Sequence, residues 1–493
     1  MIFVAALIGA GLAVLAFPPF GWWPLIVVGP MVWLAFLRRE KGPWKSALSG
    51  YLFGLAFYGG LIWWLGSLGL VAVIPLVVVQ ALYPALFAGL IVRLARTVGV
   101  GWWWVVAAGL WGLVEIVRYR FPVGGFEWGA FGYALSDLTA VRAAARWIGT
   151  AGWTVLVMAV AAGLASLRWR GEWLVAAVPL ALVAMVVAAG VSAQDLPAGV
   201  PVRVALVQGS TPCPFEHCVN ERFQTYQQHL ALTETIAPGS VDLVVWSEGS
   251  TGASNADPIN NPEVGEAIGA QAARIGSWML VGSDRPVDEQ HWINANVVFS
   301  PQGEIVGEYR KRHPVPFGEY IPARPFFDWI PALAQVPRDM IPGSGPVVFD
   351  LGDYGLGSVI SFEGGFARYI RSEVRVGAGL LVVATNEGSY GTTPASDQFI
   401  AMTRMRSAET GLDLVHAAVT GKSVLVTDGG RLGEETGLGT QEVLYGILYA
   451  RPGYKTIFVR WGNWVMLLAI GAALGVLAAR SRVGASRKNE GAV

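Results

Sequence analysis

Three side chains of different chemistry follow or interrupt apolar runs in the second half of the sequence. Glu248 follows LVVWS, Lys311 lies within YRKRHPVPFGEYIP, and Ser361 follows GSVI. A carboxylate, an ammonium group and a hydroxyl can serve as general base, oxyanion stabiliser and nucleophile. Spacing alone favours a simpler interpretation, because Glu, Lys and Ser are common surface residues at strand ends. The surrounding elements must decide between the two.

The segment that holds these residues, 198–458, is predicted to be an α/β domain. It alternates short β-branched runs with turns rich in Gly, Pro and Asn, a pattern typical of strands. We expect strands at 202–209, 242–249, 278–284, 294–300, 357–364, 380–388 and 422–430. We expect helices at 219–236, 263–276 and 398–410. Continuous apolar strands alternating with helices indicate sheets buried on both faces, with chemistry gathered where the strands end.

The rest of the chain has the composition of a membrane protein. Of the 493 residues, 54% are hydrophobic and 14% are charged, and the mean hydropathy is +0.48. A soluble globular chain carries about 25% charged residues, and a helix needs about 20 apolar residues to cross a bilayer. We therefore predict eight spans, at 2–17, 22–37, 46–65, 69–92, 102–117, 149–167, 173–192 and 461–479.

The distribution of Lys and Arg predicts the orientation of these spans. Basic residues concentrate in the loops that share a side with the termini, such as Arg38, Arg39, Lys41, Lys45, Arg480, Arg482, Arg487 and Lys488. By the positive-inside rule both termini are cytoplasmic. The predicted organisation is a transmembrane domain of seven spans (1–195), an extracytoplasmic domain (198–458), an eighth span (459–480) and a cytoplasmic tail (481–493). The protein is thus expected to be a multi-pass protein of the cytoplasmic (inner) membrane.

Charge and cysteine content narrow the possible partners. The formal net charge is zero and there is no basic stripe, so nucleic acid is not an expected partner. The two cysteines, Cys213 and Cys218, lie in the domain predicted to be extracytoplasmic. Such a pair can form a disulfide, although the short spacing needs a tight turn, and two free thiols are an equal alternative. A zinc site with His217 is the least favoured reading, because a fourth ligand is lacking.

Several motifs together resemble one known family. The most specific is KRHPVPFGEYIP, and the others are LAFPPFGWWPL (15–25), GLIWWLGSL (60–68), LVEIVRYRFPVGGFEWGAFGY (113–133) and VALVQGS (204–210). Along nearly its whole length the chain resembles bacterial apolipoprotein N-acyltransferases, membrane proteins that carry a nitrilase-type (carbon–nitrogen hydrolase) domain. The resemblance implies a polytopic α-helical membrane domain of about eight spans plus an α/β nitrilase-type αββα sandwich.

The resemblance also implies an activity and a set of site residues. In this family a cysteine takes an acyl group from a phospholipid and passes it to the α-amine of a diacylglyceryl-cysteine at the N-terminus of an apolipoprotein. Carried over by position, Glu248 is the general base, Lys311 stabilises the oxyanion, and Ser361 stands at the nucleophile. Glu319 is a second, supporting carboxylate, and Glu363 lies just beyond the nucleophile. This ping-pong acyl transfer needs no metal or cofactor, and we expect the enzyme to be a monomer.

The nucleophile position departs from the family pattern. Ser361-Phe362-Glu363 stands where the pattern has a cysteine, an aromatic residue and a glutamate, and Ser247 and the segment TNEGSYG (385–391) differ as well. A cysteine with a pKa near 8.5 is partly ionised at neutral pH, whereas a serine hydroxyl is hardly ionised at all. Three interpretations stay open: an acyltransferase that uses Ser361, a weak or inactive paralogue that binds lipids or lipoproteins, and a membrane-tethered amidase.

Overall fold

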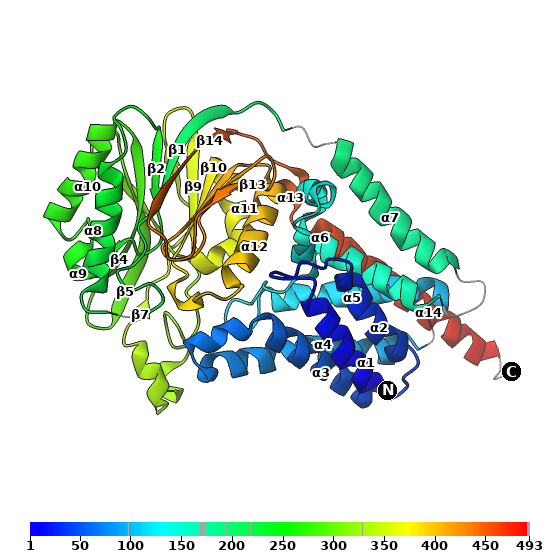
Figure 1. The fold of residues 1–493 in the computed structure, drawn as a ribbon. Helices are drawn as coiled ribbons and strands as arrows, with labels where there is room; N and C mark the ends of the chain where they lie inside the picture. The colour runs from blue at the N-terminus through cyan, green and yellow to red at the C-terminus, as the bar shows by residue number, and fades with distance from the viewer. Residues whose placement is uncertain (97, 168–172, 193–195, 217, 328, 491–493) are drawn as a thin grey trace. The chain divides into compact units, whose positions relative to one another are not determined.

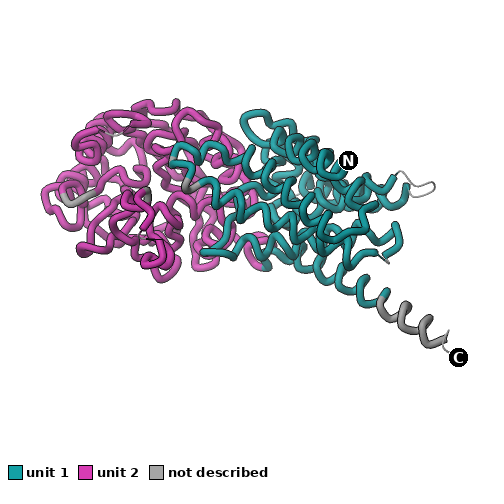
Figure 2. The backbone as a smooth tube through the Cα atoms, turned by 90° about the horizontal axis from the view of Figure 1, so that it is seen from below, with its two compact units in different colours: residues 1–194, 461–493 teal, residues 195–460 magenta. Residues whose placement is uncertain are grey.

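The structure, a computed structural model, describes residues 1–96, 98–167, 173–192, 196–216, 218–327 and 329–490. The chain divides into two compact units (Figure 2). The first comprises Met1–Gln194 and Trp461–Val493, and the second comprises Asp195–Arg460. The long apolar runs of the sequence lie in the first unit, and the short β-branched runs lie in the second.

The first unit is built from helices (Figure 1). They are α1 (Ile2–Val14), α2 (Leu25–Leu37), α3 (Pro43–Leu61), α4 (Leu70–Leu94), α5 (Val100–Arg118), α6 (Thr139–Ala165), α7 (Trp173–Ser192) and α14 (Trp464–Glu490), with short 3₁₀ turns η1 (Trp63–Leu68) and η2 (Phe131–Leu135). A helix occurs in each of the eight predicted ranges. Among the described residues, four helices are long and apolar enough to cross a membrane: Val73–Leu94, Val100–Arg118, Thr139–Ala165 and Trp173–Ser192. Eight crossings therefore stay a prediction.

The helix α6 differs from the span predicted at 149–167. It begins ten residues earlier along the chain, at Thr139, and its backbone breaks at Gly149, which has φ 67° and ψ 172°. Residues on both sides of the break are helical. The predicted start of the span, at 149, therefore coincides with a kink inside a longer helix. Glycine tolerates this left-handed φ because it has no Cβ.

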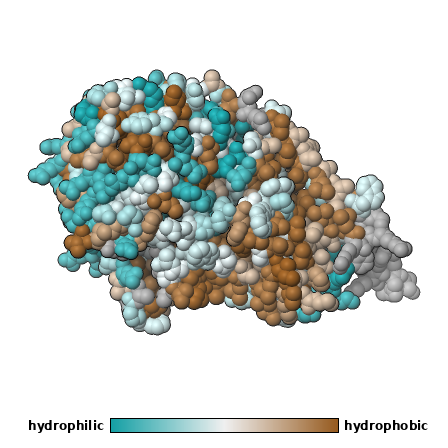
Figure 3. All heavy atoms as spheres, viewed as in Figure 1, coloured by the Kyte–Doolittle hydropathy of each residue, from teal (hydrophilic) through white to brown (hydrophobic). Residues whose placement is uncertain are grey.

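The face of the helical unit that Figure 3 shows is largely apolar. Large exposed apolar side chains of this unit include Leu70, Leu82, Trp102, Met185 and Leu468. Soluble monomers rarely expose contiguous apolar patches of more than a few hundred Å². The surface of the second unit is mostly hydrophilic in the same view. The contrast supports a lipid environment for the helical unit.

The second unit is a sandwich of two mixed sheets. The first sheet has the order β14-β1-β2-β4-β5-β6, with two short strands paired at its side, β3 to β4 and β7 to β5. Its strands are β1 (Val200–Gln208), β2 (Leu243–Trp246), β3 (Thr251–Gly252), β4 (Trp278–Pro286), β5 (His291–Phe299), β6 (Ile305–Arg310), β7 (Asp339–Met340) and β14 (Glu442–Ala450). The central strands β1, β2 and β4 are parallel, and β14, β5 and β6 pair antiparallel to their neighbours.

The second sheet has the order β13-β12-β11-β10-β9-β8. Its strands are β8 (Val348–Asp350), β9 (Gly355–Ile360), β10 (Ala378–Thr385), β11 (Leu414–Ala418), β12 (Val424–Thr427) and β13 (Arg431–Glu435). The strands β9, β10 and β11 are parallel, which brings their carboxyl ends to one edge. The 3₁₀ turn η5 (Ser361–Gly365) follows β9 directly.

Helices cover the outer face of each sheet (Figure 1). The helices of the second unit are α8 (Glu221–Glu234), α9 (Ala253–Ala256), α10 (Pro262–Ile275), α11 (Ala367–Val376), α12 (Ala395–Thr410) and α13 (Ile457–Trp461, whose last residue belongs to the first unit), with 3₁₀ turns η3 (Arg324–Phe326), η4 (Pro331–Gln335) and η6 (Gly388–Tyr390). Tyr226 of α8 and Ile268 of α10 pack with Val244 on the outside of the first sheet. Helices α11 and α12 contact the second sheet. The αββα sandwich predicted from the sequence is confirmed.

The hydrophobic core lies between the two sheets. Fully buried side chains from both inner faces form one cluster, including Leu206, Val245, Leu280, Val382 and Val415. Burying such side chains contributes about 1.5–3 kcal/mol each. A polar contact crosses this core, because Asn296 Nδ2 of β5 donates a 3.2 Å hydrogen bond to Ser358 Oγ of β9. It joins the two sheets close to the ends of the strands that carry the candidate site.

The two cysteines form a disulfide. Cys213 and Cys218 are bonded, with their Cα atoms 6.1 Å apart. The structure thus selects one of the two alternatives that the sequence left open. His217, the third member of the hypothetical zinc site, lies outside the described residues.

Candidate active site

Glu248 is placed by a tight turn at the end of β2. The strand ends at Trp246, and the next residues cross over Gly282 of β4. A Cβ at Gly282 would lie 2.2 Å from the carbonyl oxygen of Ser247 and 2.7 Å from the Cα of Glu248. The hydroxyl of Ser250 then bonds to both the N–H and the carbonyl of Gly282, at 3.2 Å each. This close approach fixes the backbone from which the Glu248 side chain projects.

The carboxylate of Glu248 is buried and held by two donors. Asn294 Nδ2 donates to Glu248 Oε1 at 2.7 Å, and Lys311 Nζ donates to the same oxygen at 3.2 Å. Asn294 lies in β5, and the backbone N–H of Lys311 donates to the Asn294 carbonyl at 2.9 Å. The edge where β2 ends is therefore also the edge where β5 begins and β6 ends. Sheet pairing, rather than proximity in sequence, assembles this contact.

Lys311 is shared by two carboxylates. Its Nζ lies 2.5 Å from Oε1 of Glu319 and 3.2 Å from Oε1 of Glu248. Burial by itself acts to lower the pKa of Lys311, but the charges of Glu248 and Glu319 outweigh it and raise the pKa above its usual value. The side chain is 1% exposed. Lys311 is thus a permanently charged donor in a site of low dielectric, where a hydrogen bond to a developing negative charge is strong.

Glu319 closes the other side of this ion-pair cluster. Its Oε1 binds Lys311, and its Oε2 accepts a 2.8 Å hydrogen bond from the backbone N–H of Val315. Burial raises the pKa of Glu319, and the charge of Lys311 opposes that shift. The turn between the two residues, including Pro316 and Gly318, brings position 319 back to position 311. Both predicted carboxylates are therefore in contact with the predicted ammonium group.

Ser361 lies on a sharp turn at the carboxyl end of β9. The strand ends at Ile360, and Ser361 has φ 51°, in the left-handed region that non-glycine residues rarely adopt. Its side chain is half-buried. Strained backbone of this kind is concentrated at functional sites, where the surrounding structure holds it in place. The sequence predicted a residue at a strand end, and the structure adds the strained turn that exposes it.

Glu363 holds this turn. Its Oε2 accepts hydrogen bonds from the N–H of Ile360 at 2.9 Å and from the hydroxyl of Tyr309 at 2.7 Å. Its Oε1 accepts from the N–H groups of Arg312 at 2.6 Å and of His313 at 3.0 Å. Burial raises the pKa of Glu363, and these donors oppose the shift.

These four bonds tie the Ser361 turn to the backbone that follows Lys311. The predicted residues therefore form one assembly. Lys311 contacts Glu248 and Glu319 directly, and Glu363 attaches the turn of Ser361 to the residues after Lys311. Such an arrangement can position a general base, a fixed positive charge and a hydroxyl around one reacting carbonyl.

Sequence reasoning missed Asn294, which donates to Glu248, and Tyr309, which donates to Glu363. A usable signal was present for Asn294. It alternates with Asn296 inside an otherwise apolar strand, and two amides on the buried face of a strand need specific partners.

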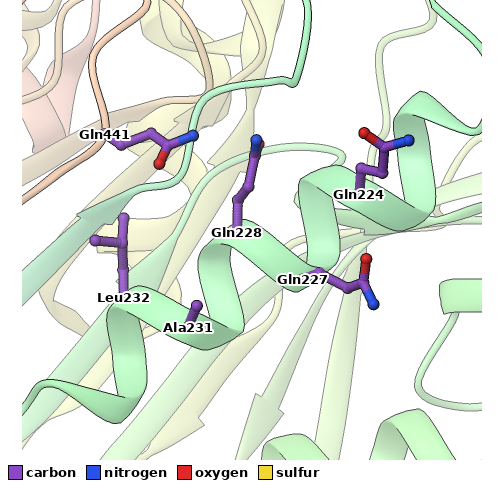
Figure 4. A pocket seen from close by; sticks show the side chains of 6 residues that line it. All are labelled: Gln224, Gln227, Gln228, Ala231, Leu232 and Gln441. Carbon is purple, nitrogen blue, oxygen red and sulfur yellow. The ribbon is translucent and has the colours of Figure 1, made fainter.

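A separate hollow of about 380 Å³ lies along α8 and the start of β14 (Figure 4). Its walls are formed by Gln224, Gln227, Gln228, Ala231, Leu232 and Gln441. It contains amide and apolar side chains but no titratable group, so it cannot supply acid–base chemistry. Across the described part of the chain, no group of three or more His, Cys, Asp or Glu side chains is placed to hold a metal ion.

Comparison with known proteins identifies the family. The profile of the apolipoprotein N-acyltransferase N-terminal domain matches residues 9–163, and that of the carbon–nitrogen hydrolases matches residues 203–448. The apolipoprotein N-acyltransferase of Methylococcus capsulatus is 31% identical and aligns over 98% of this chain and 96% of its own. The chain belongs to the apolipoprotein N-acyltransferase family. The family predicted from the motifs is thereby confirmed.

Other members of the apolipoprotein N-acyltransferase family align over a similar length. The protein from Geobacter metallireducens is 29% identical and aligns over 97% of this chain and 94% of its own. Among solved structures, a CN-hydrolase superfamily protein from Xanthomonas campestris covers 51% of this chain and 91% of its own chain, with 18% identity and a TM-score of 0.39. The carbon–nitrogen hydrolase match falls within the second unit and confirms the nitrilase-type domain.

Proposed function

We propose that this protein transfers a fatty acyl group from a membrane phospholipid to the α-amino group of the N-terminal diacylglyceryl-cysteine of apolipoproteins. The observation that carries the proposal is the buried contact of Lys311 with Glu248 and Glu319, tied through Glu363 to the strained turn of Ser361. Membership of the apolipoprotein N-acyltransferase family supports the same reaction. The transfer proceeds through an acyl-enzyme.

The first half-reaction forms an ester on Ser361. Its hydroxyl oxygen attacks the acyl carbonyl of the phospholipid while Glu248 takes the hydroxyl proton. Lys311 stabilises the negative oxygen of the tetrahedral intermediate. The bond between the carbonyl carbon and the glycerol oxygen then breaks. The leaving alkoxide receives the proton from Glu248 and departs as the lysophospholipid.

The second half-reaction uses the same three groups, and Ser361 is now the leaving group. The neutral α-amine of the acceptor attacks the Ser361 ester, and Glu248 removes a proton from the nitrogen. Lys311 again stabilises the oxyanion. Collapse breaks the bond to the Ser361 oxygen, which recovers its proton from Glu248. The products are an amide on the acceptor and the free enzyme, so no water, metal or redox partner enters the balance.

A serine makes both half-reactions harder than a cysteine would. Its hydroxyl is hardly ionised, so proton transfer to Glu248 must accompany the attack. The resulting oxygen ester is also less reactive toward an amine than a thioester. The serine therefore lowers the rate of the chemical step, whereas phospholipid binding depends on other surfaces of the protein. A lower rate with an unchanged dependence on phospholipid concentration is the signature of this exchange.

The proposal includes a membrane arrangement. Residues 1–195 form a domain of seven spans, 198–458 an extracytoplasmic catalytic domain, 459–480 an eighth span and 481–493 a cytoplasmic tail. Four helices long and apolar enough to span, the apolar surface of the helical unit and the distribution of basic residues support this arrangement. The protein acts as a monomer on a phospholipid donor and a diacylglyceryl-modified apolipoprotein.

Intact-protein mass spectrometry after incubation with phospholipid tests the reaction. The purified wild-type chain is compared with Ser361→Ala and Ser361→Cys variants. We expect an acyl adduct on the wild type and on Ser361→Cys, and none on Ser361→Ala. Addition of a diacylglyceryl-cysteine peptide should discharge the adduct and yield the N-acylated peptide.

Two other outcomes lead to different conclusions. An adduct only on Ser361→Cys would mean an intact pocket that lacks an effective nucleophile, which is the inactive-paralogue interpretation. An adduct discharged by water at the same rate with and without the peptide would mean a hydrolase. Either result would overturn the proposed transfer for the wild-type chain.

A further inference from the structure

A buried polar cluster outside the candidate active site holds the turn that follows β10. Its members are Glu387, His416 of β11, and Ser396 and Thr403 of α12, each at most 4% exposed. Glu387 Oε1 lies 3.2 Å from Nε2 of His416, and Nδ1 of His416 lies 2.9 Å from Oγ1 of Thr403. Glu387 Oε2 accepts a hydrogen bond from the hydroxyl of Ser396. Glu387 is thus joined both to the sheet and to the helix that covers it.

The space around the Glu387 carboxylate is tightly confined. A Cβ at Gly421 would lie 2.0 Å from Glu387 Oε2, so only glycine leaves room for the carboxylate there. The backbone of Glu387 has φ 60°, in the left-handed region. Non-glycine residues in this region cost about 1 kcal/mol or more and persist where other contacts hold them. The contacts of the Glu387 carboxylate with His416 and Ser396 hold the residue in this conformation.

The turn held by Glu387 lies beside the segment that carries Glu248. Its backbone is closed by a 2.9 Å hydrogen bond from the N–H of Tyr390 to the carbonyl of Glu387. Asn386, on the other side of Glu387, projects toward Gly249. A Cβ built on Gly249 would meet Asn386 Nδ2 at 3.4 Å, which is ordinary van der Waals contact. Because Gly249 directly follows Glu248, the anchored turn lies beside the segment that carries the general base.

Tyr390 brings a hydroxyl to the same region. Burial raises the pKa of Tyr390, and the negative charges of Glu387, Glu248 and Glu319 raise it further. The phenol therefore stays protonated, and the negative charges of Glu248 and Glu319, the two partners of Lys311, act on it. This effect agrees with the position of the Asn386 amide beside Gly249, which places the turn next to the candidate active site.

We propose that Glu387, held by His416 and Ser396, is a positioning residue for the acyl transfer, because it sets the turn 386–390 against Gly249 and thereby fixes where Glu248 stands. The inference rests on the proposed function for its catalytic consequence. Its structural part, the coupling between the turn and the segment around Glu248, can be measured without turnover.

Hydrogen exchange monitored by mass spectrometry tests the structural part. The full-length protein in detergent is compared as wild type, Glu387→Ala, Glu387→Asp and Glu387→Gln. We expect Glu387→Ala to accelerate exchange about tenfold in 386–391 and also in 247–250, because both segments lose a restraint. Glu387→Asp, which is one methylene shorter, should give a smaller increase in the same two segments. Faster exchange in 386–391 alone would overturn the inference.

Glu387→Gln is the conservative variant. Its amide oxygen can accept from Ser396, and its amide nitrogen can donate to Nε2 of His416 when that imidazole donates from Nδ1 to Thr403. We therefore expect wild-type exchange in both segments. Asp397→Asn is the matched control. Asp397 lies on α12, the helix that carries Ser396, and its carboxylate binds Lys422 at 2.5 Å on a partly exposed surface. This substitution should leave both segments unchanged.

Single-turnover acylation tests the catalytic part. With phospholipid in mixed micelles, Glu387→Ala should lower the saturating acylation rate constant about 100-fold and leave the half-saturating phospholipid concentration unchanged within about twofold. Glu387→Gln should restore the rate constant. A half-saturating concentration that rises with an unchanged rate constant would contradict a positioning role. If the wild type forms no acyl-enzyme, the proposed function fails, and the exchange data still decide the coupling.

Discussion

The backbone N–H of Arg312 donates a 2.6 Å hydrogen bond to Oε1 of Glu363, and this bond connects the two halves of the candidate active site. Arg312 follows the predicted oxyanion stabiliser, and Glu363 lies two residues beyond the predicted nucleophile. The position of Ser361 relative to Lys311 thus depends on a carboxylate that need not touch substrate.

Replacing Glu363 by glutamine is expected to destabilise the protein. The carboxylate accepts from four donors, Ile360 N–H, Tyr309 hydroxyl, Arg312 N–H and His313 N–H. An amide NH₂ can accept none of them, so two donors would be left buried and unpaired, at a cost of about 2–4 kcal/mol. Thermal unfolding in detergent measures the change.

Asp350→Asn is the control for that measurement, because Asp350 is an exposed carboxylate that accepts one bond, from the N–H of Gly352. It should change the stability by less than about 0.5 kcal/mol. Equal effects of the two substitutions would show that the Glu363 contacts do not hold the turn.

Removing the charge of Lys311 should lower the stability of the protein. Removing the charge of one partner carboxylate as well should restore part of that stability. Lys311→Met leaves Glu248 and Glu319 buried without their cation, which costs about 3–5 kcal/mol. In Lys311→Met/Glu319→Gln one of these charges is gone, so the double variant should be more stable than the single variant. Thermal unfolding of the wild type, both single variants and the double variant completes the double-mutant cycle. A double variant less stable than Lys311→Met would contradict the conclusion that Lys311 neutralises both carboxylates.

Gly282→Ala is expected to displace the general base. The new Cβ would meet the carbonyl of Ser247 at 2.2 Å, so the turn that carries Glu248 must move. A displacement of about 1 Å can lower a catalytic rate about 100-fold. The acylation rate constant is the measurement. In Gly307→Ala of β6, in the same sheet, the Cβ would meet Phe349 at 3.4 Å, an ordinary contact, and the rate should stay unchanged.

His229 makes the second unit sensitive to acid. Burial lowers the pKa of His229 to about 4, against about 6.5 in an unfolded chain. Gly209 N–H donates to Nε2, and Nδ1 lies 2.8 Å from the Thr225 carbonyl, so the folded state holds the neutral ring. Between these pH values the unfolded chain binds more protons, and stability falls by up to about 3 kcal/mol as the pH drops from 6.5 through 4.

The variant His229→Gln should lack this part of the acid sensitivity, while His291→Gln, at an exposed position, should retain it. Thermal unfolding between pH 4 and pH 7 gives the three curves. Curves for the wild type and His229→Gln that run parallel over the whole range would rule out His229 as the group responsible.

Much of the fold was predictable because its signals are local. Each of the seven predicted strand ranges overlaps a strand, and the three predicted helix ranges overlap α8, α10 and α12. The predicted ranges omitted several strands, among them β6, β11 and β14. Residues 442–450 of β14 pair with β1, more than two hundred residues earlier, and most of the strand is only partly buried. The identity of β14 as a strand therefore depends on pairing more than on apolar character.

The site divides in the same way. The types and approximate locations of Glu248, Lys311, Glu319, Ser361 and Glu363 came from motifs, whereas the partners of each came from the fold. Asn294 and Tyr309 carried no motif and were missed. Glu387 and Ser389 were recognised only as departures from a family pattern, and the structure shows that Glu387 is a buried anchor.

The sequence by itself determined which chemical groups are present, which segments are apolar enough for a membrane, and the family to which the chain belongs. These properties depend on residue type and short-range order. Only the tertiary structure decided that one ammonium group serves two carboxylates, that Ser361 is held at a positive φ, and that Glu387 is joined to His416 and Ser396. Lys311 and Glu248 are 63 positions apart, and Asn294 and Glu248 are 46 apart. Contacts at such separations arise when strands pair and sheets pack, because the free energy of burying the core is what brings their ends together.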